Sequence, residues 1–193
     1  MKVAIIQYSS GNVASVDFAL RRCGVEGIVT ANHKTIMESD KVILPGVGAA
    51  GAAMASLRST GLDKLIPTLE QPVLGICLGM QLLCYYSQED KTYCTGIVKQ
   101  SVRRFPGTLK VPKTGWGGIN DLRTPLFSGI NEQSFMYFVH SYSVPLCEET
   151  IATAGYNGKY SAAIKKDNFY GVQFHPEKSA EAGHQLLQNF ISL

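Results

Sequence analysis

The sequence has few charged residues, and neither sign of charge is concentrated along it. Charged side chains make up 17% of the 193 residues, and 18 basic against 15 acidic residues give a net charge of only +3. Ordinary soluble domains carry about 25% charged residues. Because nucleic acids and anionic membranes are recognised by clustered Lys and Arg, we expect neither as a partner. The 45% of hydrophobic residues predicts a folded chain with a large apolar interior.

Long apolar runs are missing as well. The run Val3 to Ile6 is too short for the core of a signal peptide, and no run approaches the roughly 18 residues of a membrane span. Cysteine is sparse, odd in number and without a C-x-x-C pair or a nearby His at zinc spacing. We therefore expect a reduced, cytoplasmic protein without a structural metal. The five cysteines are Cys23, Cys77, Cys84, Cys94 and Cys147.

Short apolar runs alternate with helical periodicity in the first half of the chain. This alternation predicts a parallel, doubly wound sheet. Predicted strands cover residues 2–8, 25–30, 41–44 and 73–76. Predicted helices cover residues 13–23, 35–39, 49–58, 61–70 and 78–86.

The second half has a different character. Residues 94–129 are rich in Gly, Pro, Lys and Thr, which favours hairpins and loops. Without a repeat or a linker, residues 1–193 are expected to form one α/β domain, with a mostly parallel central sheet, flanking helices and an additional antiparallel β region. Strands are predicted over 135–139, 151–155, 161–165 and 169–174, and a final helix over 180–191.

A cysteine stands at the centre of residues 75–79 (GICLG), between a predicted strand and a predicted helix. This context is typical of a nucleophile elbow, in which Cys77 replaces the usual serine. The flanking glycines suit a strained turn where strand and helix approach closely. The head of a helix also favours a thiolate. The alternative is a small cysteine that fills a buried turn.

A cysteine nucleophile needs a proton acceptor, and the sequence offers four histidines. His175 is the strongest candidate, because the proline after it forces an extended backbone. In an extended chain Glu177 shares its face and can orient the ring. His140 ends a predicted strand and is equally compatible with a site residue and a packed one. His33 and His184 lie in helical or surface segments, where a solvated role is expected.

Thioester chemistry also requires backbone N–H groups that stabilise an oxyanion. The amide of Leu78, directly after the cysteine, is one such donor. The loop 45–48 (PGVG) follows a predicted strand and exposes further amides, although an ordinary glycine turn explains the same residues. The sequence contains no P-loop motif, so ATP binding of that kind is not expected.

Together, three segments resemble the class I (triad) glutamine amidotransferases: residues 45–48 (PGVG), 75–81 (GICLGMQ) and 171–179 (GVQFHPEKS). The elbow and the His-Pro-Glu motif are shared across the class. The PGVG loop and the stretch 137–142 (YFVHSY) are most similar to the glutaminase subunits of imidazole glycerol phosphate synthases. The resemblance runs from Lys2 to the C-terminal helix and implies the fold of that class.

The resemblance implies glutamine hydrolysis for histidine biosynthesis. In the family the cysteine, here Cys77, attacks L-glutamine, and the histidine, here His175, protonates the departing ammonia and activates water while Glu177 fixes the imidazole. The ammonia reaches a barrel-shaped cyclase subunit in a heterodimer, which makes imidazole glycerol phosphate and an aminoimidazole carboxamide ribotide. No cofactor is implied. The oxyanion amides correspond to Val47 and Leu78, and the substrate pocket to Gly48, Gln81, Glu89, Ser141 and Tyr142.

One segment departs from the family pattern. Where that pattern has His-Met-Gly-Trp-Asn after a proline, residues 112–118 read PKTGWGG. The segment faces the partner in the family, so the change concerns docking and control rather than the triad. Three alternatives remain at this point: a paralogue that feeds ammonia to another synthase, such as a sugar-modifying enzyme; a catalytically silent assembly subunit; and a cysteine peptidase, which the small-substrate pocket disfavours.

Overall fold

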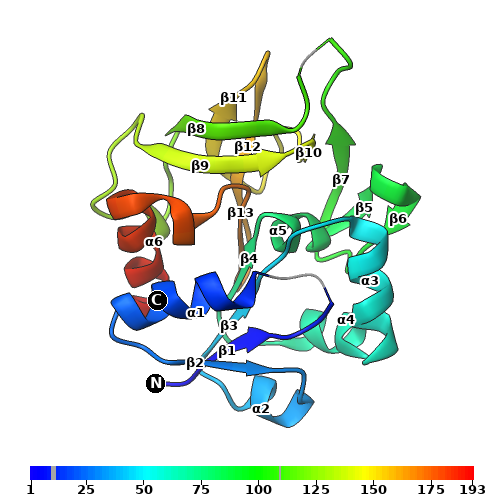
Figure 1. Ribbon diagram of the computed structural model, residues 1–193, viewed down its shortest axis with the longest axis vertical. Coiled ribbons are helices and arrows are strands. Elements are labelled where there is room, and N and C mark those ends of the chain that lie inside the picture. The colour runs from blue at the N-terminus through cyan, green and yellow to red at the C-terminus, as the bar shows by residue number, and fades with distance from the viewer. Residues whose placement is uncertain (10–11, 109) are drawn as a thin grey trace.

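A computed structural model describes residues 1–9, 12–108 and 110–193 of the protein. Its centre is a mixed β-sheet, which Figure 1 shows running from β2 near the N-terminus to β8 and β9 at the opposite end. Within the described residues nine strands form this sheet, in the order β2 (Gly27–Thr30), β1 (Val3–Ile6), β3 (Lys41–Leu44), β4 (Val73–Ile76), β13 (Phe169–Val172), β12 (Lys159–Lys166), β11 (Thr150–Gly155), β8 (Lys113–Asn120) and β9 (Phe135–His140).

The strands from β2 to β13 pair in parallel and are covered on both faces. Val3 and Ile5 pack into one apolar cluster, whereas Ala4 and Ile6 pack into another, as the alternation of a doubly covered strand requires. Helices α1 (Val13–Arg22) and α6 (Ala180–Ser192) contribute to the first cluster. The second cluster includes residues of α3 (Ala50–Ser59), α4 (Leu62–Leu65) and α5 (Leu78–Leu82). The predicted doubly wound arrangement is confirmed.

The antiparallel β region predicted for the second half is also present. Strands β12, β11, β8 and β9 pair antiparallel and continue the parallel sheet beyond β13. The described part of residues 94–129 contains two strands, β7 (Val98–Arg104) and β8, which do not pair with each other. Strand β8 pairs with β9 and β11, whereas β7 belongs to a second sheet. That second sheet has the order β10 (Tyr142–Ser143), β7, β5 (Cys84–Ser87) and β6 (Thr92–Tyr93).

The predicted helix over 78–86 is wrong in its second half. Helix α5 ends at Leu82, and Cys84–Ser87 forms strand β5. Tyr86 pairs with Tyr93 of β6 and with Ser101 of β7. An apolar run of this length fits either a helix or a strand, so the pairing partners that only the folded chain supplies decided the outcome.

The remaining elements are short. No helix within the described ranges is long and apolar enough to span a membrane. The remaining short elements are helix α2 (His33–Met37) and the 3₁₀ turns η1 (Ile66–Thr68), η2 (Glu89–Lys91), η3 (Pro125–Phe127) and η4 (Pro176–Lys178).

The position of β13 determines which loops meet at one edge of the sheet. Strand β13 lies near the end of the sequence, yet it pairs in parallel with β4, with Val172 opposite Ile76. The carboxyl ends of neighbouring parallel strands meet at the same edge of a sheet, where α/β proteins place their ligands. The residues directly after β4 and β13 are therefore brought together.

Candidate active site

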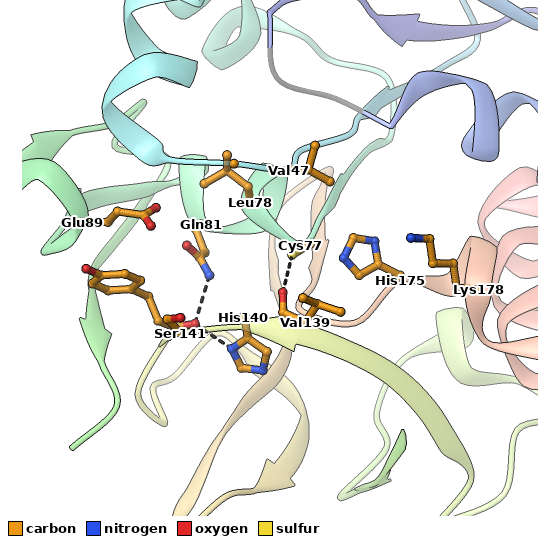
Figure 2. Close-up of a pocket in the computed structure, with 12 residues that line it drawn as sticks. Val47, Cys77, Leu78, Gln81, Glu89, Val139, His140, Ser141, His175 and Lys178 are labelled. Carbon is orange, nitrogen blue, oxygen red and sulfur yellow. Dashed lines mark hydrogen bonds between the residues drawn. The ribbon is translucent and has the colours of Figure 1, made fainter. Parts of the chain in front are cut away.

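Cys77 occupies a strained turn between β4 and α5. Its backbone has φ 54° and ψ −109°, a combination that residues with a Cβ rarely adopt. The Cys77 amide donates to the carbonyl of Val172 at 2.8 Å, which fixes the turn against β13. The sulfur lies 3.6 Å from the Val139 carbonyl oxygen, a contact drawn in Figure 2. The strand, strained turn and helix expected of a nucleophile elbow are all present.

Glycines make this turn possible. A Cβ on Gly75 would lie 2.7 Å from the carbonyl carbon of Gly79, and a Cβ on Gly79 would collide with the Leu44 carbonyl oxygen. A Cβ on Gly46 would lie 2.5 Å from the Gly79 nitrogen. The PGVG loop and the elbow are thus in direct backbone contact, which brings the neighbouring Val47 and the first residue of α5 to the same side of Cys77 (Figure 2).

His175 follows β13 and lies beside Cys77, with its ring next to the sulfur (Figure 2). Its Nδ1 lies 2.8 Å from Oε1 of Glu177, and these two side chains are only 5% and 1% exposed. His175 has the extended backbone that the following proline favours, but Glu177 lies in the 3₁₀ turn η4. The prediction that the two residues share a face of an extended chain is therefore wrong in its geometry, although their contact exists.

The surroundings of His175 favour its protonated form. Burial lowers its pKa, but hydrogen-bond and charge interactions with Cys77 and Glu177 outweigh burial and raise the pKa to about 10. The imidazole then keeps its proton at neutral pH. An imidazolium beside a cysteine sulfur stabilises the thiolate, which is the nucleophilic form.

Both residues open onto a cavity of about 190 Å³. Glu177 lies behind His175, whereas the other residues predicted for the site all line the cavity. Three further lining residues, Val139, His140 and Lys178, are not among those predicted, although the sequence of the strand that ends at His140 is compatible with a site residue there. The full lining is Val47, Gly48, Cys77, Leu78, Gln81, Glu89, Val139, His140, Ser141, Tyr142, His175 and Lys178.

The buried side-chain amides of Gln81 and Gln173 connect the cavity wall to the Cys77 sulfur through hydrogen bonds. Gln81 donates from Nε2 to the Tyr142 carbonyl at 3.1 Å and to Oε1 of Gln173 at 2.9 Å. Gln173, fully buried, places its Nε2 3.7 Å from the sulfur of Cys77. Sequence reasoning missed Gln173, although a lone polar residue between Val172 and Phe174, in an otherwise apolar stretch, is a usable signal.

Glu89 lies at the end of the cavity away from His175 (Figure 2). Its Oε2 accepts from the amide of Ala50 at 2.9 Å, and the neighbouring Asp90 accepts from Gly51 at 3.3 Å, so both carboxylates bind the amino end of α3. The pKa of Glu89 is raised overall. Burial raises it most and the charge of Asp90 adds to this, whereas the hydrogen bond from the Ala50 amide lowers it. A carboxylate at this end of the cavity suits the ammonium group of a bound amino acid.

His33 and His184 lie outside the cavity lining, as expected, but they are half-buried and bonded to protein groups rather than solvated. His33 hydrogen-bonds the Thr60 carbonyl through Nε2 at 2.8 Å, and His184 lies 3.4 Å from the sulfur of Cys23, both away from the cavity lining. Among the described residues no group of three or more His, Cys, Asp or Glu side chains is arranged to hold a metal ion.

The geometry agrees with comparisons to known proteins. The family described as Glutamine amidotransferase class-I matches residues 4–193, and the protein belongs to this family. Within it, the chain is 50% identical to the imidazole glycerol phosphate synthase subunit HisH of Bacteroides thetaiotaomicron and 45% identical to that of Pectobacterium atrosepticum, and each match covers 100% of both chains. The fold and family expected from the motifs are confirmed.

Solved structures show the same fold at low sequence identity. A crystal structure of a glutamine amidotransferase superposes with a TM-score of 0.78 at 16% identity, covering 100% of this chain and 98% of the other. A glutamine amidotransferase from Thermotoga maritima gives a TM-score of 0.64 at 18% identity, covering 100% of this chain and 83% of the other.

Proposed function

We propose that residues 1–193 form the glutaminase of an imidazole glycerol phosphate synthase, which hydrolyses L-glutamine and supplies ammonia for histidine biosynthesis. The observation that carries this proposal is the order of groups along one cavity: a Cys77 thiol, a His175 imidazole backed by a buried carboxylate, and a carboxylate at the far end. The full-length similarity to HisH subunits supports the same assignment.

The first half-reaction forms a thioester. The thiolate of Cys77 attacks the carboxamide carbon of glutamine, and the carbonyl electron pair moves to oxygen. The amides of Val47 and Leu78 stabilise this oxyanion. His175 gives its proton to the amide nitrogen, so that the carbon–nitrogen bond breaks and ammonia leaves. Glu177 holds Nδ1 and keeps Nε2 directed at the reacting atoms.

The second half-reaction returns the enzyme to its starting state. His175, now neutral, takes a proton from water as the oxygen attacks the thioester carbon. The tetrahedral intermediate collapses, glutamate leaves, and Cys77 is released as a thiolate beside a protonated imidazole. Because Glu177 is almost completely buried, its charge acts on the imidazole without screening by water.

The amino-acid end of glutamine occupies the other part of the cavity. There Glu89 pairs with the ammonium group, while Gly48, Gln81, Ser141 and Tyr142 surround the backbone atoms of the substrate. A cavity of about 190 Å³ matches the size of one amino acid. This size favours glutaminase chemistry over peptidase chemistry.

The ammonia acceptor is a cyclase subunit that forms a heterodimer with this chain, and the complex resides in the cytoplasm. The HisH name of the relatives supports the first assignment. The five free cysteines suit a reducing compartment and support the second. Hydrolysis of glutamine through a cysteine thioester requires no cofactor.

The Cys77→Ala variant tests the proposal. The variant, assembled with the cyclase, should lose glutamine-dependent synthesis but retain synthesis with added ammonium salts, because only ammonia release is removed. Cys147→Ala, a change of a partly buried thiol away from the cavity lining, should retain both activities. Glutamine-dependent synthesis by Cys77→Ala would contradict the proposal.

A second measurement separates the remaining alternatives. A diazoketone analogue of glutamine should alkylate Cys77, which a silent assembly subunit would not permit. Mixing the protein with a histidine-pathway cyclase should give a complex and stimulate glutaminase activity. Alkylation without complex or stimulation would assign the glutaminase to a different synthase, in keeping with its departure from the family pattern at residues 112–118.

A further inference from the structure

Lys113, at the start of β8, is a buried lysine in an aromatic environment. Its side chain is not directed to solvent, since the residue is only 8% exposed. Nζ donates to the Tyr160 hydroxyl at 2.8 Å and to the Gly155 carbonyl at 3.4 Å, and it lies 4.1 Å from the centre of the Phe138 ring. Lysine is among the residues least often buried, because taking an ammonium group out of water is costly. The position of this charge therefore requires an explanation beyond packing.

The residue opposite Lys113 is His140. The two are register partners of the antiparallel strands β8 and β9, so their side chains share one face of the sheet. Tyr160 connects them, because its hydroxyl lies 3.3 Å from Nε2 of His140. The other ring nitrogen, Nδ1, lies 2.7 Å from the carbonyl oxygen of Tyr142.

The chemistry of the two ends fixes the first and last of these bonds, and a neutral His140 fixes the one between them. An ammonium group only donates, and a carbonyl oxygen only accepts. Lys113 therefore donates to Tyr160, the tyrosine hydroxyl donates to Nε2 of His140, and Nδ1–H donates to Tyr142. The middle bond has this direction because His140 is neutral. Burial lowers the pKa of His140 to about 4, although its bond to Tyr142 raises it, and the Lys113 charge lowers it further.

The chain of bonds ends at the wall of the cavity. Nδ1 of His140 and Nε2 of Gln81 both lie within hydrogen-bond distance of the Tyr142 carbonyl oxygen, and two dashed lines in Figure 2 start from these side chains. Gln81 also holds Gln173, whose amide faces the Cys77 sulfur. A buried polar chain with every member bonded restricts the positions of all its members. Lys113, which is absent from the described lining of the cavity, is therefore connected to it.

We propose that Lys113 is a positioning residue for glutamine binding: through Tyr160 and His140 it fixes the Tyr142 carbonyl, and with it Gln81, at the wall of the substrate pocket. The inference rests on the proposed glutaminase function. It assigns a role within this chain to one position of the segment that departs from the family pattern. The competing explanation is that Lys113 only fills space, in which case an apolar side chain of similar length would serve equally well.

Alkylation kinetics distinguish the two explanations, with Lys113→Met as the test variant and Lys110→Met, a change of an exposed lysine three residues earlier, as the control. For the diazoketone analogue of glutamine, Lys113→Met should raise the inhibition constant about three- to tenfold, the effect of one weakened buried hydrogen bond. The limiting rate, and the alkylation rate with iodoacetamide, which needs no amino-acid pocket, should change less than about twofold. Lys110→Met should match the wild type in all three.

A double-mutant cycle tests the route through Tyr160. If Lys113 acts through this hydroxyl, Lys113→Met combined with Tyr160→Phe should raise the inhibition constant no more than Tyr160→Phe alone. Additive effects would contradict the route. The melting temperature of each variant establishes that it is folded, and Tyr160→Phe, which keeps the lysine, decides the question should Lys113→Met be unstable.

Nitrogen NMR of His140 provides a readout independent of activity. The wild-type ring should be neutral and protonated on Nδ1, with Nε2 accepting a hydrogen bond. The Nε2 resonance should move toward that of an unbonded imidazole nitrogen in Lys113→Met and Tyr160→Phe, but not in Lys110→Met. An unchanged inhibition constant in folded Lys113→Met, or an Nε2-protonated wild-type ring, would overturn the inference. Failure of the wild type to react with the glutamine analogue would instead count against the proposed function, and the NMR result would still decide the network.

Discussion

Nδ1 of His175 and Oε1 of Glu177 lie 2.8 Å apart in a place that solvent scarcely reaches. The second carboxylate oxygen of Glu177 is also buried and has no hydrogen-bond partner among the described residues. Within the described part of the chain, the His175 imidazole is therefore the main hydrogen-bond partner of this carboxylate. A buried carboxylate with one main partner acts strongly on that partner, and here it helps to raise the pKa of His175.

Neutralising Glu177 should therefore slow glutamine hydrolysis strongly. Glu177→Gln keeps the size of the side chain but removes the charge that helps to raise the pKa of His175. We expect kcat to fall by about 10² to 10⁴, the range typical of losing a correctly held general acid and base. Glu181→Gln, at an exposed position of α6, should leave kcat unchanged in the same steady-state assay. A loss below about threefold for Glu177→Gln would contradict the assignment.

The hydrogen bond from Gln173 to the sulfur should support thiolate reactivity. Gln173→Met preserves approximate volume and removes the amide that faces Cys77 at 3.7 Å. A hydrogen bond to a charged group contributes about 1.5 to 3 kcal/mol, so we expect the iodoacetamide reaction at neutral pH to slow by roughly 10-fold or more. This rate is measured by quenching the alkylation at successive times and quantifying the modified protein by mass spectrometry. An unaltered rate would mean that the amide does not stabilise the thiolate.

Adding a methyl group at the elbow should destabilise the fold. Gly79→Ala would place Cβ against the Leu44 carbonyl, a backbone atom that cannot move without displacing β3. We expect the free energy of unfolding to fall by about 1 to 3 kcal/mol or more in urea denaturation. Gly107→Ala is the matched control, because a Cβ there meets nothing within 4 Å. Equal stability of the two variants would show that the elbow has room for a side chain.

His140 should make the protein sensitive to acid. Its pKa is about 4 in the folded state, lowered chiefly by burial, against about 6.5 in the unfolded chain. The unfolded state therefore binds more protons below pH 6.5, and stability falls as the pH drops toward 4, by about 3 kcal/mol in total. Urea unfolding between pH 7 and 4 should show this loss. His140→Gln should flatten the dependence, and an equally steep loss in that variant would exclude His140 as its source.

The sequence predicted most of the parallel half correctly because its signals are local. Residues 41–44 and 73–76 are strands with the predicted limits, since each is a short apolar run closed by a proline, a glycine or the elbow cysteine. The helix predicted over residues 78–86 fails beyond Leu82 because Tyr86 finds strand partners in two other segments. Pairing of this kind depends on distant residues, which periodicity does not reveal.

The chemistry of the candidate site was determined by residue types and short spacings: a cysteine between glycines, a histidine before a proline, and a glutamate two residues later. Only the tertiary structure decided that β13 lies beside β4 and so brings residues 77 and 175 to one cavity. The same is true of the polar partners of Gln173 and Lys113, because these partners lie far away in the sequence. The physical reason is that side-chain types fix which bonds are possible, whereas packing between distant segments fixes which of them form.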